Sequence, residues 1–216
     1  MPEHRCELDG AALVLIGSFN PAIVQPSWLA RHKLIRDEEA DAAEVRMVLP
    51  QLTDFTVAGL SLQVTQDRLV VTTVDASKFQ PLCDLVIGMF TLLEHTPATA
   101  IGVNRMMHFR LPSAEKFRGF GDMLAPKQVW EAKLTSPALL SETMQGQRPS
   151  SSSKQLRMKI ESSVRVAPFG VYFESNEHFE PGGQDVSALR RIVAEFAMGS
   201  LAYARDLADH LLSQQY

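Results

Sequence analysis

The order of apolar and polar residues divides the chain into segments with strand-like and helix-like periods. The apolar run 12–20 predicts a central strand, and the strict alternation in 60–66 predicts a strand with one buried face. The segment 77–95 repeats its apolar residues at helical spacing, which predicts a helix with one buried stripe. Further strands are expected at 44–50, 54–59, 69–74, 99–111, 138–149, 154–166 and 170–180, and further helices at 26–34, 113–124, 126–134 and 186–212. The acidic segment 36–44 either extends the first helix or forms a solvated turn of its own.

Serine residues follow a proline at two points where a long strand is expected to give way to a helix. Ser27 and Ser113 are suited to cap these helices, because a serine hydroxyl accepts a hydrogen bond from a backbone N–H of the first turn. Ser77 and Gln80 have the spacing of a capping box, which predicts where the helix 77–95 begins. The expected helices therefore have recognisable start signals.

Two further residue types mark the expected corners between strand and helix. Asn20 and Asn104 stand where each long strand is expected to end, and a short amide there can bond the backbone. Trp28 and Trp130 lie near helix starts, where a large apolar side chain normally packs the helix against the sheet. We therefore interpret these residues as structural rather than as a binding site.

The two halves of the chain, 1–97 and 98–216, share the order strand, helix, several short strands, long helix. This order predicts an α+β fold in which an antiparallel sheet has helices packed on one face. An internal duplication into two β-α-β(3-4)-α units, sharing one continuous sheet and core, would explain the order. Shared corner chemistry alone would explain it equally well, so both origins stay open.

Four stretches, GSFNPAI, PSWL, GVNRMMHF and LAPKQVW, resemble a sporadically distributed group of bacterial proteins without an established activity. The element order resembles the duplicated fold of the TATA-box-binding protein, in which two β-α-β-β-β-β-α units join their sheets. None of that protein's DNA-reading residues has a match in this sequence. The resemblances imply an architecture and a bacterial setting but no mechanism.

Composition narrows the class of protein. A chain of 216 residues with 45% hydrophobic and 21% charged residues can form a folded core. The net charge of −4 argues against a general nucleic-acid coat protein. No long apolar run predicts a transmembrane helix and the first residues do not resemble a signal peptide. Two distant cysteines favour a reducing, cytoplasmic setting.

Motifs for catalysis or metal binding are not found in the sequence. The six histidines form no HExxH motif and no pair at helical spacing, and no GxSxG elbow occurs. Gly119-Phe120-Gly121 lacks the third glycine of a dinucleotide loop, and Cys83 is expected to be a buried, inert thiol. His108, on a strand, is interpreted as a semi-buried residue with a partner. We therefore expect no metal and no cofactor, and the sequence favours a protein that is not an enzyme, without settling the question.

The strongest functional indication is electrostatic. Within 154–166, Leu156, Met158 and Ile160 alternate with charged residues, which predicts a strand with one basic, exposed face. Such a face can meet a phosphate backbone or an acidic partner, but exposed strands also carry lysine and arginine to discourage edge pairing. The candidate binding residues are Arg148, Lys154, Arg157, Lys159 and Arg165.

These observations favour a non-enzymatic binding or assembly module that uses its exposed sheet face to engage a protein partner. The bacterial resemblance suggests an accessory subunit of a multi-component system such as phage defence. The alternative is a nucleic-acid-binding domain that uses the basic strand face. A hydrolase or transferase whose residues converge only in the fold is the least favoured. The long C-terminal helix could pair with a second copy, which leaves the oligomeric state open.

Overall fold

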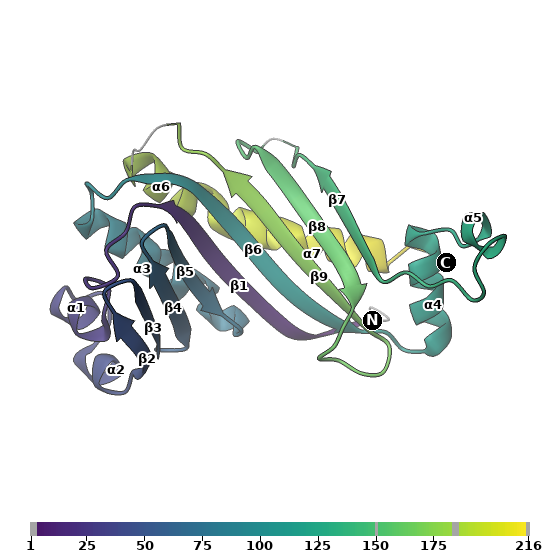
Figure 1. Ribbon diagram of the computed structural model, residues 1–216, viewed down its shortest axis with the longest axis horizontal. Coiled ribbons are helices and arrows are strands. Elements are labelled where there is room, and N and C mark those ends of the chain that lie inside the picture. Colours follow the sequence, from purple (N-terminus) through teal and green to yellow (C-terminus); the bar gives the residue numbers. More distant parts are fainter. Residues whose placement is uncertain (1–3, 150, 183–185, 215–216) are drawn as a thin grey trace.

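The computed structural model describes residues 4–149, 151–182 and 186–214 (Figure 1). Its strands form one nine-stranded antiparallel sheet in the order β2-β3-β4-β5-β1-β6-β9-β8-β7. The strands are β1 (Arg5–Gly17), β2 (Glu44–Leu49), β3 (Leu52–Val57), β4 (Leu60–Thr65), β5 (Arg68–Thr73), β6 (Ala98–Arg110), β7 (Ser141–Gly146), β8 (Gln155–Ser162) and β9 (Gly170–Phe179). The expected α+β fold is confirmed.

The helices lie mainly on one side of the sheet. They are α1 (Pro26–Arg31), α2 (Asp37–Asp41), α3 (Phe79–Leu92), α4 (Ala114–Leu124), α5 (Gln128–Glu131), α6 (Val186–Ile192) and α7 (Met198–Leu212). A 3₁₀ turn at 76–78 precedes α3, and a π-helical stretch at 193–197 joins α6 to α7. Within the described residues, no helix is long and apolar enough to cross a membrane.

The two longest strands, β1 and β6, pair at the centre of the sheet, with Leu13 opposite Val103. Strands β5, β4, β3 and β2 follow on one side of this pair, and β9, β8 and β7 follow on the other. Both halves of the chain therefore contribute to one continuous sheet. The order strand, helices, short strands, long helix recurs in each half, while the origin of this order by duplication stays a prediction.

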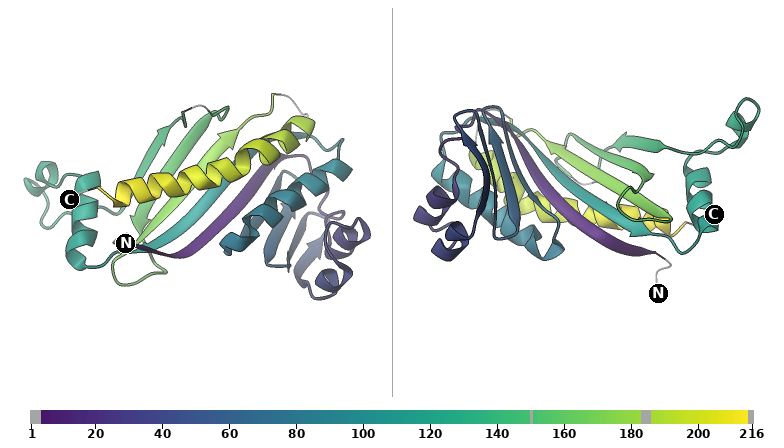
Figure 2. Two further views of the ribbon diagram at one scale, coloured as in Figure 1. Left: turned by 180° about the vertical axis from the view of Figure 1, so that it is seen from behind. Right: turned by 60° about the horizontal axis from the view of Figure 1, so that its bottom comes forward.

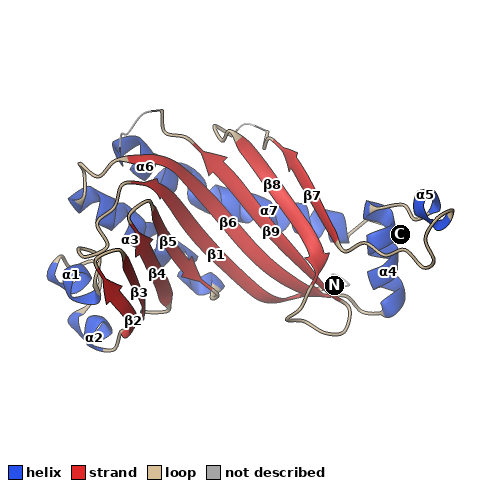
Figure 3. Cartoon of the chain, in the orientation of Figure 1, coloured by secondary structure: helices blue, strands red, loops and turns tan. Residues whose placement is uncertain are grey.

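One face of the sheet is covered by α3 and by the long segment α6–α7, as the view from behind shows (Figure 2). In the front view no helix crosses β1, β6, β9 or β8 (Figure 3). We call these the covered face and the open face. The strand period separates them: in β8, Leu156, Met158 and Ile160 are buried, whereas Arg157 is exposed.

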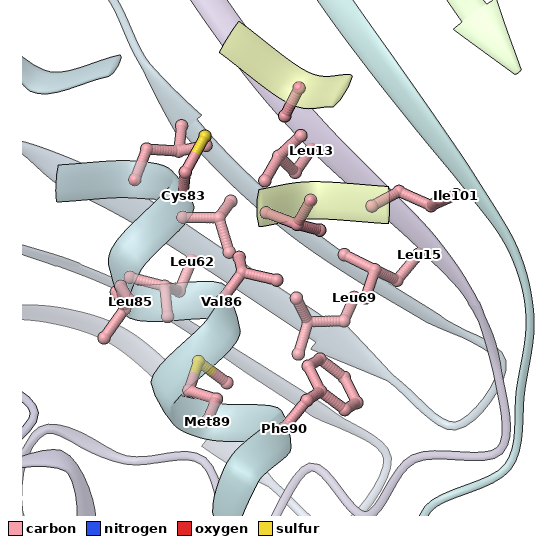
Figure 4. Packing of buried hydrophobic residues seen from close by; sticks show 14 of the residues in the cluster. Leu13, Leu15, Leu62, Leu69, Cys83, Leu85, Val86, Met89, Phe90 and Ile101 are labelled. Atoms are coloured by element: carbon pink, nitrogen blue, oxygen red, sulfur yellow. The ribbon is translucent and has the colours of Figure 1, made fainter. Parts of the chain in front are cut away.

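The larger part of the core lies between α3 and the first half of the sheet (Figure 4). The apolar stripe of α3, including Val86, Met89 and Phe90, packs against Leu13 and Leu62 from the strands. Leu82 is buried in the same cluster. Cys83 lies in this cluster, and burial raises the pKa of its thiol to about 11. The expected stripe and the burial of the Cys83 thiol are both confirmed.

A second cluster lies under the other half of the sheet. Phe109 from β6 and Phe173 from β9 meet edge to face, with ring centroids 5.5 Å apart. Ala204 and Ala208 from α7 and Phe120 from α4 complete the cluster. The small alanine side chains allow α7 to lie close to the strands.

Of the three predicted helix caps, the structure confirms one and contradicts two. Ser113 caps α4, because its Oγ accepts a hydrogen bond from the N–H of Lys116 at 3.2 Å. The expected cap at Ser27 is wrong: Pro26 is already the first residue of α1, so Ser27 lies inside the first turn. The capping box at Ser77 is also wrong, since Asp75 accepts the N–H of Ser77 and α3 begins later.

Of the residues expected at corners between strand and helix, Asn20 and Trp28 are placed as expected and Asn104 is not. Asn20 bonds the backbone as expected, its Oδ1 accepting the N–H of Ala22 at 3.1 Å, and Trp28 packs against the core. Asn104 is not a corner residue, because β6 continues to Arg110 and places Asn104 in the middle of the strand. Its role in the open face is described below.

Two elements are more exposed than their apolar residues suggest. Every residue of β2 is exposed, because this strand is the edge of the sheet and no helix covers it. The helix expected at 126–134 is only the short α5, and Trp130 is 53% exposed rather than packed in the core. Both lie at the ends of the molecule, where the sheet offers no further surface to pack against.

Candidate functional site

A row of polar side chains crosses the open face at the level of Asn104. In the strand register Asn104 of β6 lies opposite Asn176 of β9, and Asn176 lies opposite Arg157 of β8. Gln145 of the edge strand β7 continues the row beyond Arg157. Residues that are directly opposite on antiparallel strands share a face and contact each other, so the row is a continuous polar strip.

The two asparagines at the centre are fixed by hydrogen bonds. Asn176 Nδ2 donates to Asn104 Oδ1 at 2.6 Å, and Asn104 Nδ2 donates to the carbonyls of Ala12 and Gly102 at 3.3 Å each. Gly102 makes room for this pair, since a Cβ there would lie 2.8 Å from Asn176 Nδ2. The amides therefore form a preorganised floor.

A second row runs beside the first. It contains Met106 of β6, Glu174 of β9, Lys159 of β8 and Thr143 of β7. Together the two rows border a hollow of about 390 Å³ on the open face, lined by Asn104, Thr143, Arg157, Lys159, Glu174 and Asn176. Its lining is polar and contains charges of both signs.

The charged groups of the second row have intramolecular partners. Lys159 Nζ lies 2.7 Å from a carboxylate oxygen of Glu161, and this hydrogen bond raises the pKa of Lys159. Tyr172 donates its hydroxyl to Glu174 at 3.3 Å. Burial, followed by the charge of Glu174, raises the pKa of Tyr172, so the phenol stays protonated.

His108 lies at the end of the open face and has the partner expected for it. Its Nδ1 is 2.7 Å from Ser163 Oγ, and its ring stacks on Tyr172 with centroids 4.6 Å apart. Burial and the charge of Arg165 lower the pKa of His108.

Ser163 Oγ also accepts the N–H groups of Arg165 and Val166. The hydroxyl hydrogen of Ser163 is therefore the one left for neutral His108. The pair, together with the two backbone N–H groups that Ser163 accepts, fixes the loop after β8.

The five candidate basic residues do not form one surface. Arg157 and Lys159 share the open face, and Lys154, at the start of β8, pairs with Glu180 at 2.6 Å. Arg165 lies in the loop after β8. The expectation fails for Arg148: it lies on the covered face, because the chain turns before β8 and carries its side chain toward α7.

Arg148 instead neutralises a carboxylate beneath the sheet. Its Nε lies 3.0 Å from Glu177 Oε1, which also accepts the hydroxyl of Ser151 at 2.7 Å, and its Cζ lies 5.5 Å from the ring centre of Tyr203. Burial tends to raise the pKa of Glu177, but serine hydroxyls and Arg148 outweigh it and lower the pKa. This pair is structural.

Sequence reasoning singled out Asn104, Arg157 and Lys159 but missed the other half of the hollow. Asn176 and Glu174 were not singled out, although β9 alternates the polar residues 172, 174, 176 and 178 with buried ones. That alternation could have indicated a polar open face. The meeting of Asn104 with Asn176 could not be foreseen, since it depends on the register of β6 against β9.

Among the described residues, no group of three histidine, cysteine, aspartate or glutamate side chains is placed to hold a metal ion. No protein-family model and no curated protein matches this chain. The fold and the site thus define an α+β protein with one covered and one open, polar sheet face.

Proposed function

We propose that this protein is a non-enzymatic binding module that engages a protein partner through the open face of its sheet. The observation that supports this most directly is the asymmetry of the sheet. One face is filled by apolar packing against α3 and α7, while the other presents ordered polar side chains and a hollow to the surroundings. Polar groups that are already ordered lower the conformational cost of binding a partner.

The balance of charge favours a protein over a nucleic acid. Arg46 on β2 pairs with Asp54, Arg110 on β6 pairs with Glu7, and Lys159 pairs with Glu161. A surface for a phosphate backbone needs cations that are not already neutralised. A polar surface with charges of both signs is compatible with the rim of a protein–protein interface. A role as an accessory subunit of a bacterial multi-component system would fit such a module.

The test is affinity purification from the native host after nuclease treatment, with two matched variants on β7. Thr143→Trp fills the hollow on the open face, whereas Met144→Trp changes the neighbouring residue on the other face of the same exposed strand. We expect one stoichiometric protein partner with the wild type and with Met144→Trp, and its loss with Thr143→Trp. Recovery of the bare chain alone would overturn the proposal.

The nucleic-acid alternative is tested separately on a polyanion column. Reversing both charges on β8, Arg157→Glu with Lys159→Glu, removes the two cations that share the open face. If the protein binds nucleic acid through this strand, retention falls sharply in the double variant. We expect unchanged, weak retention, because Lys159 is already paired with Glu161 and the protein carries a net charge of −4.

A further inference from the structure

The geometry points to the hollow as a carboxylate-binding site, in which Arg157 forms a two-pronged hydrogen bond with an aspartate or glutamate side chain of an acidic peptide segment. This inference rests on the proposed function, because it names the chemistry that the partner presents to the open face. It concerns the ligand of the site and not only the existence of a partner.

Arg157 differs from its charged neighbours by its surroundings. The cross-strand neighbours of Arg157 are two neutral amides, Asn176 on β9 and Gln145 on β7. Across residues 4–149, 151–182 and 186–214, no carboxylate is paired with Arg157, whereas Lys159, two residues further along β8, is held by Glu161. A planar guanidinium matches a carboxylate with two parallel N–H···O bonds, which a lysine cannot form.

The floor beside Arg157 is prepared for a ligand. Asn176 is held by its bond to Asn104, which is anchored to the backbone of β1. That bond uses one N–H of the Asn176 amide and leaves the other available as a donor. Because these side chains are already ordered, binding does not have to immobilise them first.

The charge of Glu174 favours a singly charged carboxylate over a phosphate as the ligand of the hollow. It lines the same hollow, directly opposite Lys159 on the neighbouring strand. A carboxylate side chain brings one negative charge to Arg157, whereas a phosphate near neutral pH brings more charge and is repelled more strongly by Glu174. An extended acidic peptide can also place its flanking backbone over the amides of the strip.

The test is an NMR titration of the full chain with an acetylated, amidated hexaglutamate peptide, with hexaglutamine as the neutral probe. We expect saturable shifts of the Arg157 Nε–H and the Asn176 side-chain amide with hexaglutamate only. Arg157→Gln should weaken binding by about 10-fold or more, as expected for a charge-assisted hydrogen bond. The affinity of Arg157→Lys should lie between those of the wild type and Arg157→Gln, because lysine keeps the positive charge but cannot form the two parallel hydrogen bonds.

Arg68→Gln is the matched control. Arg68 is an exposed arginine at the start of β5, on the same face but in the other half of the sheet. Its substitution should leave the affinity unchanged. If Arg157→Gln and Arg68→Gln weaken binding equally, hexaglutamate is attracted to surface cations in general. If inorganic phosphate or single-stranded DNA competes as well as a carboxylate peptide does, the hollow is a general anion site. Either result overturns the inference.

The two proposals fail in different ways. If hexaglutamate produces no shifts while Thr143→Trp still abolishes capture of a native partner, the carboxylate site is wrong and the binding face stands. If hexaglutamate binds through Arg157 while the native host yields no partner, the proposed function is wrong.

Discussion

At the scale of single residues, the buried pair Arg148–Glu177 shows how charge is used inside this protein. The Glu177 side chain is 1% exposed and that of Arg148 is 15% exposed, so both have lost most of their contact with water. A buried carboxylate is tolerated only when a cation and hydrogen bonds replace its hydration. Glu177 has both at Oε1, from Arg148 and Ser151, whereas its buried Oε2 has no hydrogen-bond partner among the described residues.

Removing Arg148 should therefore destabilise the fold in a pH-dependent manner. Arg148→Ala leaves the Glu177 carboxylate without its cation, and we expect a loss of about 3 kcal/mol or more in the free energy of unfolding at pH 7. Because the folded pKa of Glu177 is lowered from its ordinary 4.5, its stabilisation is present above that pH and is lost as the pH falls through the folded pKa. Urea unfolding at several pH values measures both effects.

The gap between wild type and Arg148→Ala should narrow as the pH falls below about 5, since protonation removes the unpaired charge from the variant. Lys154→Ala is the control, because Lys154 and its partner Glu180 are both largely exposed. Its loss should stay below about 1 kcal/mol. A gap that does not depend on pH would mean that Arg148 acts through packing alone.

At the scale of elements, charged side chains tie α7 to the two central strands. Arg105 of β6 donates to both carboxylate oxygens of Asp9 on β1, at 2.9 and 2.6 Å, and to the carbonyl of Leu201 on α7 at 2.5 Å. Arg205 of α7 reaches Asp209 at 2.7 Å and Asp9 at 3.7 Å. Three elements that are far apart in the sequence are thereby held in one arrangement.

The helix α3 stabilises the sheet mainly through its buried apolar stripe. Leu82→Ala opens a cavity at a fully buried position and should cost about 2–5 kcal/mol of unfolding free energy. Leu92→Ala makes the same chemical change on the same helix, but Leu92 is 43% exposed. We expect it to cost less than about 1 kcal/mol in chemical denaturation. Similar losses at both positions would contradict the packing described for α3.

At the scale of the whole molecule, the two halves share both the sheet and the core. β1 and β6 pair along their lengths. The core beneath the first half includes Ile101 and Val103 from β6 and Leu189 and Leu201 from the C-terminal helices. A half without these residues would expose a large apolar surface and a long unpaired strand edge.

We therefore expect the fragment 1–97 to show no cooperative thermal transition by circular dichroism, whereas the full chain melts in one transition. Co-expression with 98–216 should restore the cooperative transition, since the missing strand and side chains are then supplied in trans. A native-like, cooperatively melting 1–97 would show that the first half is an independent domain.

Much of the fold could be predicted because it depends on local periodicity. The alternation in β4, the stripe of α3 and the cap at Ser113 are each decided by residues within one turn or one strand. The errors have two sources, one in adjacent residues and one in the packing of neighbouring elements. Ser27 loses its role because Pro26 already begins the helix, and Trp130 is exposed because no sheet surface reaches it.

The sequence by itself determined the class of fold and the periods of its strands and helices. It also determined that Arg157 and Lys159 lie on the face of β8 away from the buried Leu156 and Met158. Only the tertiary structure decided that Asn104 meets Asn176 beside Arg157, and that Arg148 lies on the other side of the sheet. The physical reason is that side-chain direction along a strand follows from a local two-residue period, whereas the neighbours of a strand follow from long-range pairing and register. The candidate site depends on those neighbours.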